Sequence, residues 1–92
     1  MNVTVQYCAQ IKQAVGITSE VVELDGSCSA QDLILRLAEK HGDPVRGFLL
    51  DDDGRQRINN LLVVGEDQVC WNTPRLLEDG DVVMILPPIS GG

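Results

Sequence analysis

The feature that most constrains the fold is an unbroken apolar run, Val82-Val83-Met84-Ile85-Leu86, which leads directly into Pro87-Pro88. Five consecutive apolar residues predict a strand that is buried on both faces, and such a strand needs a neighbour on each side. The two prolines must end the strand, because they lack backbone N–H groups and have a fixed φ. Since 92 residues form one small domain, we expect residues 82–86 to be its central strand.

The N-terminal segment is the best candidate for one neighbour of this central strand. Val3, Val5 and Tyr7 alternate with Thr4, Gln6 and Cys8, which predicts a half-buried strand over residues 3–8. In residues 9–15 the apolar residues Ile11, Ala14 and Val15 are spaced as in a short helix, which is expected to end at Gly16. A second alternating strand is expected over residues 19–24. The first two strands are therefore predicted to form a loose hairpin.

The clearest helix is expected to begin after Ser29. Serine is a good N-cap, and Asp32 favours a helix N-terminus three residues later. Apolar residues then recur at spacings of three and four, and Gly42 supplies the position after the helix end. The lone His41 is interpreted as part of this helix terminus, without a catalytic partner.

The remaining segments are short. Residues 45–50 are expected to be a strand or a helical turn, and residues 61–64 a buried strand. A further strand is predicted over residues 69–71. Thr73-Pro74 is typical of a helix start and predicts a helical turn, with Leu76 and Leu77 both pointing inward.

These elements predict an α+β fold, in which a small mixed sheet packs on one main helix. The helix is expected to bury Leu33, Leu37 and Ala38 against Val5, Val22, Val63 and Ile85. We place the domain at residues 1–86 and a flexible C-terminal tail at residues 87–92.

Composition argues against several classes of function. The net charge is −7 and the pI is about 4.3, so nucleic acid and anionic membranes are not expected partners. The longest apolar runs are about five residues, whereas a membrane span needs roughly 20. Met1 is followed at once by strand-like sequence, so no signal peptide is expected. Cys8, Cys28 and Cys70 are widely spaced, which predicts reduced thiols in a cytoplasmic protein, and no metal site is expected.

The sequence ends in Ile89-Ser90-Gly91-Gly92, and this tail suggests a chemistry. Glycines have no Cβ, so Gly91 and Gly92 fit a channel that is too narrow for other residues. The Gly92 α-carboxylate would become an acyl adenylate by attack on the α-phosphate of ATP, after which a sulfur nucleophile or an amine would displace AMP. A chance pair of terminal glycines and a cloning scar are the alternatives, and the two preceding prolines make the scar less attractive.

Three segments resemble the β-grasp sulfur carriers of the MoaD/ThiS type, which are ubiquitin-like in fold. Residues 7–16, Tyr-Cys-Ala-Gln-Ile-Lys-Gln-Ala-Val-Gly, are similar to the run that follows the first strand of that family. Residues 79–83, Asp-Gly-Asp-Val-Val, resemble its turn before the last strand. Residues 87–92 resemble the tail of the small subunit of molybdopterin synthase. The usual Val-Asn-Gly after the middle strand is absent, since Val63-Val64-Gly65 stands there.

The resemblance implies a role as a sulfur donor that contributes no catalytic side chain. A ubiquitin-activating-type adenylyltransferase would supply ATP and adenylate Gly92, and sulfur transfer would then give a thiocarboxylate. The large catalytic subunit of molybdopterin synthase, or another sulfur acceptor enzyme, would take the sulfur, and no cofactor would be bound by the carrier itself. The partner-binding residues implied for the tail are Pro87, Pro88, Ile89, Ser90 and Gly91. The exposed face of the sheet would also dock partners and could involve Phe48, Leu61 or Trp71, with core packing as the alternative for each.

Other readings remain open at this point. The chain could instead be a ubiquitin-like modifier whose Gly92 is joined to lysines of target proteins. It could also carry sulfur for thiamin or cysteine synthesis, or be an interaction domain with an inert tail. A direct enzyme is the weakest reading, because the sequence shows no nucleophile–base pair and no phosphate-binding glycine loop.

Overall fold

A computed structural model describes residues 1–88 of the chain. In this range the elements follow one another as β1 (Asn2–Tyr7), α1 (Ala9–Val15), β2 (Ser19–Glu23), α2 (Ala30–His41), α3 (Arg46–Leu49), β3 (Leu61–Val64), β4 (Asp67–Gln68) and β5 (Val82–Leu86). The segment 45–50, for which a strand or a helical turn was expected, contains the helix α3.

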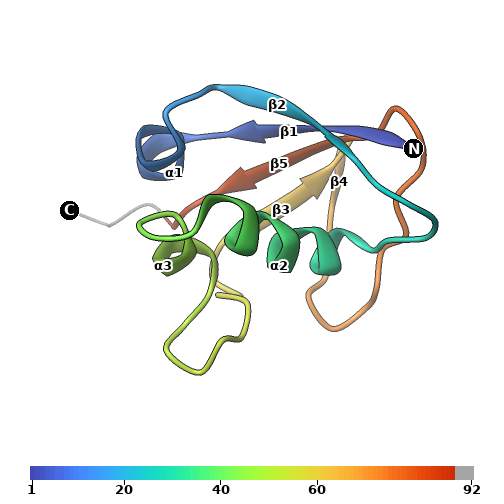
Figure 1. Ribbon diagram of the computed structural model, residues 1–92. Coiled ribbons are helices and arrows are strands. Elements are labelled where there is room, and N and C mark those ends of the chain that lie inside the picture. The colour runs from blue at the N-terminus through green and yellow to red at the C-terminus, as the bar shows by residue number, and fades with distance from the viewer. Residues whose placement is uncertain (89–92) are drawn as a thin grey trace.

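The strands form one mixed sheet in the order β2-β1-β5-β3-β4 (Figure 1). β5 lies at its centre, parallel to β1 and antiparallel to β3. The other pairs, β1 with β2 and β3 with β4, are antiparallel. The prediction of a central C-terminal strand beside the N-terminal strand is therefore confirmed, as is the α+β class with a mixed sheet on one main helix.

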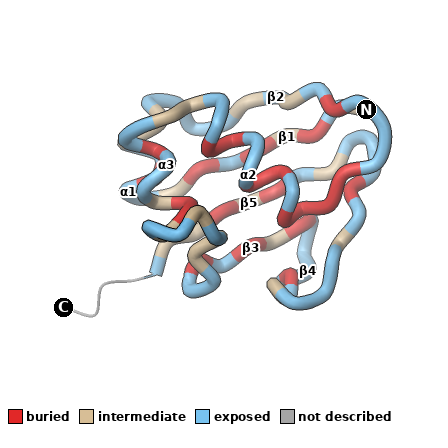
Figure 2. Tube along the Cα trace, turned by 60° about the horizontal axis from the view of Figure 1, so that its bottom comes forward, coloured by how far each residue is buried: buried red, intermediate tan, exposed pale blue. Residues whose placement is uncertain are grey.

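α2 covers one face of this sheet (Figure 1). Its first turn is capped as predicted, because the Ser29 hydroxyl oxygen accepts a hydrogen bond of 3.0 Å from the Asp32 N–H. Its buried side chains meet the inward positions of the strands, and buried and exposed residues alternate along the chain (Figure 2). The inward positions of the three inner strands are Val3, Val5, Tyr7, Leu62, Val64, Val83 and Ile85. Val63, expected in the core, is half-buried on the outer face instead.

The short helices α1 and α3 lie at the end of the sheet where β5 finishes (Figure 1). α1 closes at Gly16, whose φ of 89° is in the left-handed region that glycine adopts without strain. Ile11 anchors α1 and Leu49 anchors α3, since both side chains are fully buried. The two helices therefore flank the point where the chain leaves the sheet.

The prediction of a strand over residues 69–71 is wrong. Val64 pairs with Asp67, so the hairpin turn holds only Gly65 and Glu66, and β4 begins at once with Asp67–Gln68. A two-residue turn fixes the register of the strand after it, whatever the strand propensity of that strand's residues. Val69 still donates its N–H to the Leu62 carbonyl, at 2.8 Å, and the chain then leaves the sheet.

The helical turn predicted after Thr73-Pro74 is also wrong. This segment runs alongside the residues that precede α2, and Leu76 forms an isolated antiparallel bridge with Ser29. Ala30 donates its N–H to the Arg75 carbonyl and Leu77 donates to the Cys28 carbonyl, at 2.8 and 2.9 Å. Bridging in extended conformation points successive side chains in opposite directions, so Leu77 is buried and Leu76 is exposed.

Residues 1–88 include no helix that is long and apolar enough to cross a membrane.

Candidate functional site

The candidate site is the base of the C-terminal tail. β5 remains paired to its last residue, because Leu86 lies opposite Leu61 of β3. Pro87 and Pro88 follow directly, the first half-buried and the second exposed. The other predicted tail residues, Ile89, Ser90, Gly91 and Gly92, lie outside the described residues, so their predicted roles stay predictions.

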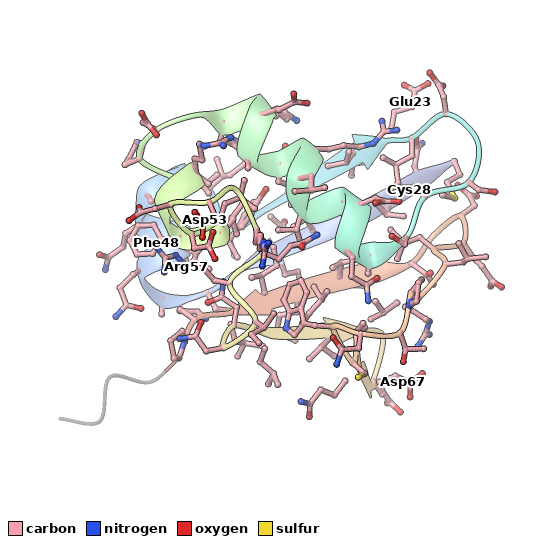
Figure 3. The ribbon with its side chains drawn as sticks, turned by 90° about the horizontal axis from the view of Figure 1, so that it is seen from below. Glu23, Cys28, Phe48, Asp53, Arg57 and Asp67 are labelled. Atoms are coloured by element: carbon pink, nitrogen blue, oxygen red, sulfur yellow. The ribbon has the colours of Figure 1, made fainter. Side chains whose placement is uncertain are left out.

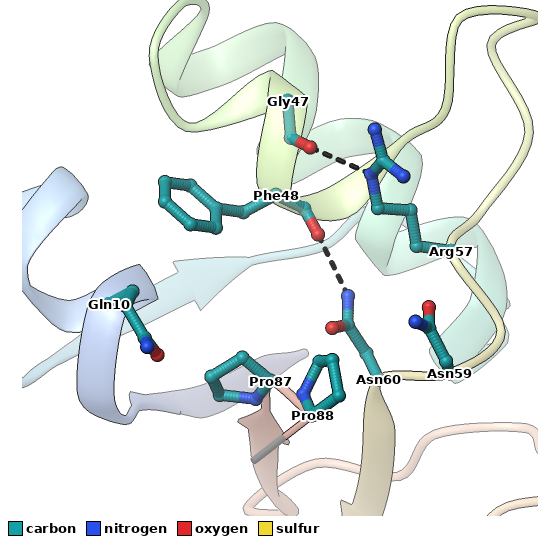
Figure 4. Close-up of a pocket in the computed structure, with 8 residues that line it drawn as sticks. All are labelled: Gln10, Gly47, Phe48, Arg57, Asn59, Asn60, Pro87 and Pro88. Atoms are coloured by element: carbon teal, nitrogen blue, oxygen red, sulfur yellow. Dashed lines mark hydrogen bonds between the residues drawn. The ribbon is translucent and has the colours of Figure 1, made fainter. Parts of the chain in front are cut away.

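An open pocket of about 300 Å³ lies beside the two prolines (Figure 4). It is formed by α1, by α3, by the segment that leads into β3, and by the start of the tail. The lining residues are Gln10, Gly47, Phe48, Arg57, Asn59, Asn60, Pro87 and Pro88. The structure thus brings Phe48 together with the two tail prolines. Phe48 is partly buried against the core and does not lie on the outer face of the sheet.

Two hydrogen bonds hold the wall of this pocket (Figure 4). The Asn60 side-chain amide donates to the Phe48 carbonyl at 2.8 Å, and Arg57 Nε donates to the Gly47 carbonyl at 2.8 Å. Asn60 is only 5% exposed, and its own carbonyl accepts from the Trp71 indole at 3.0 Å. Both side chains thus position α3 against the tail. Sequence analysis missed them, because a polar segment before a strand carries no periodic signal.

A second surface lies on the outer face of the sheet, opposite α2. Leu61 and Val63 of β3 lie opposite Leu86 and Met84 of β5. We call these four residues the outer apolar patch. Leu61 is 39% exposed and the other three are half-buried, and the patch ends at Leu86, immediately before the tail. Of the residues expected on a docking surface, Leu61 belongs to this patch.

Trp71 lies elsewhere. It is half-buried against the core, in the loop that follows β4, and its indole is hydrogen-bonded to Asn60.

A charged cluster joins β1, β2 and the end of α2. Glu20 accepts from the Tyr7 hydroxyl at 2.5 Å, from Lys40 Nζ at 2.5 Å, and lies 2.6 Å from His41 Nε2. Burial alone would raise the pKa of Glu20, but hydrogen bonds from Lys40, Tyr7 and His41 outweigh it and hold the pKa below its usual range. Burial, with the Glu20 hydrogen bond, raises the pKa of Tyr7. His41 therefore has partners that sequence analysis did not foresee.

The cluster has a structural role, since it ties the edge strand β2 to the helix. No group of three or more His, Cys, Asp or Glu side chains that could hold a metal ion is found within residues 1–88. Two surface features remain as candidate sites in the described part of the chain: the tail-base pocket and the outer apolar patch.

Together, the five-stranded mixed sheet, the helix across it and the tail at the end of the central strand define a ubiquitin-like β-grasp protein. Residues 5–92 match the model of the ThiS family, and the chain belongs to that family. The resemblance identified from the motifs is thereby confirmed.

Two relatives illustrate the range of the family. Small archaeal modifier protein 3 of Haloferax volcanii is 29% identical over 93 residues, which cover all of both chains. The molybdopterin synthase sulfur carrier subunit of Chlamydomonas reinhardtii is 26% identical over 92 residues, again covering all of both chains. The similar proteins thus include both sulfur carriers and a protein modifier.

Solved structures agree with this fold. SAMP1 from Haloferax volcanii has a TM-score of 0.87 at 20% identity, covering 100% of both chains. The complex of subunits 1 and 2 of the molybdopterin-converting factor from Helicobacter pylori 26695 contains a chain with a TM-score of 0.59 at 22% identity, covering 100% of both chains. In that protein, a small β-grasp-like chain assembles with a second subunit.

Proposed function

We propose that this protein is a sulfur carrier for molybdopterin biosynthesis, with the Gly92 carboxylate as its reactive group. A ubiquitin-activating-type adenylyltransferase joins this carboxylate to the α-phosphate of ATP and releases pyrophosphate. Sulfur transfer from a persulfide then displaces AMP and yields a thiocarboxylate. The large subunit of a molybdopterin synthase takes the sulfur from it.

The observation that carries this proposal is the way in which the central strand becomes the tail. β5 is paired on both sides up to Ile85 and with β3 up to Leu86, and the two prolines that follow stiffen its exit. Four residues follow Pro88, which span about 14 Å when extended. Such a segment reaches a buried reaction centre while the domain stays outside. Family membership over residues 5–92 supports the same reading.

The choice of molybdopterin as the destination of the sulfur is supported by two relatives. The sulfur carrier subunits of Chlamydomonas reinhardtii and Drosophila yakuba, 26% and 29% identical to this chain, are both named for molybdopterin synthase. The Pro87-Pro88 pair supports the same destination, because it is part of the tail that resembles the small subunit of molybdopterin synthase.

The outer apolar patch is the surface that best fits a large partner subunit. It is continuous with Leu86, so one partner would bind the patch and receive the tail together. An apolar patch on an otherwise acidic domain is typical of a protein–protein interface. Phe48 and the tail-base pocket would extend this contact round the end of the sheet.

The test is the intact mass of the purified protein after incubation with ATP, a sulfur donor and the adenylyltransferase of its own host. Exchange of one oxygen for sulfur is expected in the full chain and not in a variant that lacks Gly92. Sulfur loading that persisted without Gly92 would show that the mechanism is wrong. An unchanged mass with a demonstrably active enzyme would favour an inert interaction domain.

A second candidate is favoured by the archaeal relative. The 29% identity to small archaeal modifier protein 3 covers the whole chain, so Gly92 would instead be joined to amines of target proteins. The same assay separates the two functions, because a modifier yields a ladder of heavier conjugates. The chain has two lysines, and Lys40 is paired with Glu20, so self-conjugation would fall mainly on Lys12.

A further inference from the structure

We propose that Arg57 is a receptor for a carboxylate side chain of the activating enzyme, at the base of the tail. The inference rests on the proposed function, because it assumes that an adenylyltransferase grips this end of the domain. It adds a specific recognition element to that step, one that selects the partner before the tail reaches ATP.

The guanidinium of Arg57 is held in place on one side. Its Nε donates to the Gly47 carbonyl at 2.8 Å, which fixes the plane of the group against α3 (Figure 4). Arg57 is half-buried and lines the tail-base pocket together with both prolines. The two terminal nitrogens of an arginine held through Nε form the pair that binds a carboxylate or phosphate with two parallel hydrogen bonds.

This guanidinium lacks an acidic partner in the described part of the chain. No carboxylate oxygen within residues 1–88 lies within 4.0 Å of Arg57, although the protein carries 14 acidic residues. The neighbouring Asp51 is occupied within its own turn, where its carboxylate accepts from the N–H groups of Asp53 and Arg55 at 2.9 and 3.0 Å. Among the described residues, Arg57 is therefore oriented by its hydrogen bond to Gly47 and has no ion-pair partner.

An adjacent hollow of about 260 Å³ is also lined by Arg57. Arg46 and Arg57 face Asp43, Asp51 and Asp52 there, so this hollow adds no net positive charge to the site. Phe48, Asp53 and Arg57 lie at one end of the molecule, whereas Cys28 and Asp67 lie at the other (Figure 3). Within residues 1–88, Arg57 is therefore a cation with no carboxylate within 4.0 Å, in a protein whose net charge is −7.

The reach of the tail indicates which anion binds here. The α-phosphate of ATP must meet Gly92, about 14 Å beyond Pro88 in an extended tail. Arg57 lines the same pocket as Pro88, at the start of the tail, and is thus too far back to contact that phosphate. What faces Arg57 during adenylation is the surface of the enzyme around the entrance of its channel. The anion on a protein surface is an Asp or Glu carboxylate.

The experiment measures two quantities with the adenylyltransferase of the protein's own host. The first is the affinity for the enzyme by calorimetry without ATP, and the second is the rate of thiocarboxylate formation by intact mass. Arg57→Gln removes the charge, and Arg57→Lys keeps the charge without the paired donors. Arg55→Gln is the matched control, because Arg55 is on the same segment, exposed, and outside the tail-base pocket. Thermal unfolding of each variant checks that the domain stays folded.

The expected result is a loss of about tenfold in affinity for Arg57→Gln at low salt, a smaller loss for Arg57→Lys, and no loss for Arg55→Gln. The difference between wild type and Arg57→Gln should shrink as salt is raised. Equal affinity of wild type and both Arg57 variants would overturn the inference. Tighter binding by Arg57→Gln would also overturn it, since Arg57 would then hold the chain's own terminal carboxylate.

The two readouts keep this inference separate from the proposed function. If wild type binds the enzyme but gains no sulfur, the carrier function fails, and the affinities still decide the role of Arg57. If wild type does not bind the enzyme, Arg57 cannot be a recognition residue for it, and the inference is wrong.

Discussion

Replacement of Gln31 by alanine should destabilise the protein by about 2–3 kcal/mol. Gln31 lies in the first turn of α2 and is 9% exposed. Its amide nitrogen donates to the carbonyls of Cys70 and Thr73 at 3.1 and 2.9 Å, and its amide oxygen accepts from the Arg75 N–H at 3.2 Å. One side chain therefore fixes the loop that connects β4 to β5.

The magnitude follows from these three contacts. A hydrogen bond in a protein contributes about 1 kcal/mol net, so three bonds give about 3 kcal/mol. The loop lies at the surface, where water reaches part of the exposed backbone and offsets some of the loss. For a domain of this size, 1 kcal/mol lowers the melting temperature by about 4–8 °C, so we expect a decrease of at least about 8 °C.

Urea unfolding monitored by Trp71 fluorescence measures this loss, and amide hydrogen exchange locates it. Exchange should accelerate over residues 70–75, while the strands of the sheet keep their protection. Gln31→Glu should be at least as destabilising as Gln31→Ala at neutral pH, because it places a charged acceptor against the Cys70 and Thr73 carbonyls. Gln13→Ala is the control, since Gln13 is exposed on α1 and should have an effect below about 0.5 kcal/mol. If Gln31→Ala were no more destabilising than this control, the reasoning would be refuted.

Three further predictions address the other features of the molecule. Glu20→Gln should lower the free energy of unfolding by about 2 kcal/mol at pH 7. Because the folded-state pKa of Glu20 is held below its usual 4.5, that contribution is present above this value and is lost as the pH falls through the lowered pKa, so acid titration of both proteins should show their stabilities converging. Cys70 is exposed and should react with a thiol reagent at once, whereas Cys28 is buried with a raised pKa and should react only on unfolding; early labelling of Cys28 would contradict the fold. Met84→Thr should weaken binding to the large partner subunit and keep the domain folded in thermal unfolding, because threonine keeps a strand-forming side chain at this half-buried position; unchanged binding would exclude the outer apolar patch as the docking surface.

The features that could be predicted from the sequence depend on local patterns. The central strand followed from five apolar residues and two prolines, and the main helix followed from its Ser29 cap and its apolar spacing. Both are short-range signals that the tertiary structure did not override. The tail base was predicted in the same way, because Pro87 and Pro88 must end a strand wherever the strand lies.

The features that were missed depend on contacts between segments far apart in the sequence. Tyr7, Glu20 and His41 meet only because β1, β2 and the end of α2 converge. Arg57 and Asn60 are polar residues in an irregular segment, and they acquire a role only when α3 packs beside them. The misplaced strand at residues 69–71 has a related cause. The two-residue turn at Gly65-Glu66 set the register there, and the apolar pattern did not.

The architecture of β5 links the stability of the domain to the delivery of its tail. The inward side chains Val83 and Ile85 are fully buried, while Met84 and Leu86 on the same strand belong to the outer apolar patch. The strand that anchors the core is thus also the strand that the proposed partner would grip and that directs Pro87 outward. Loosening of the core would change the direction of the tail, and partner binding to the outer face would stabilise the sheet in return. A central strand with neighbours on both sides therefore holds Pro87, the first residue beyond the sheet, more firmly than an edge strand would.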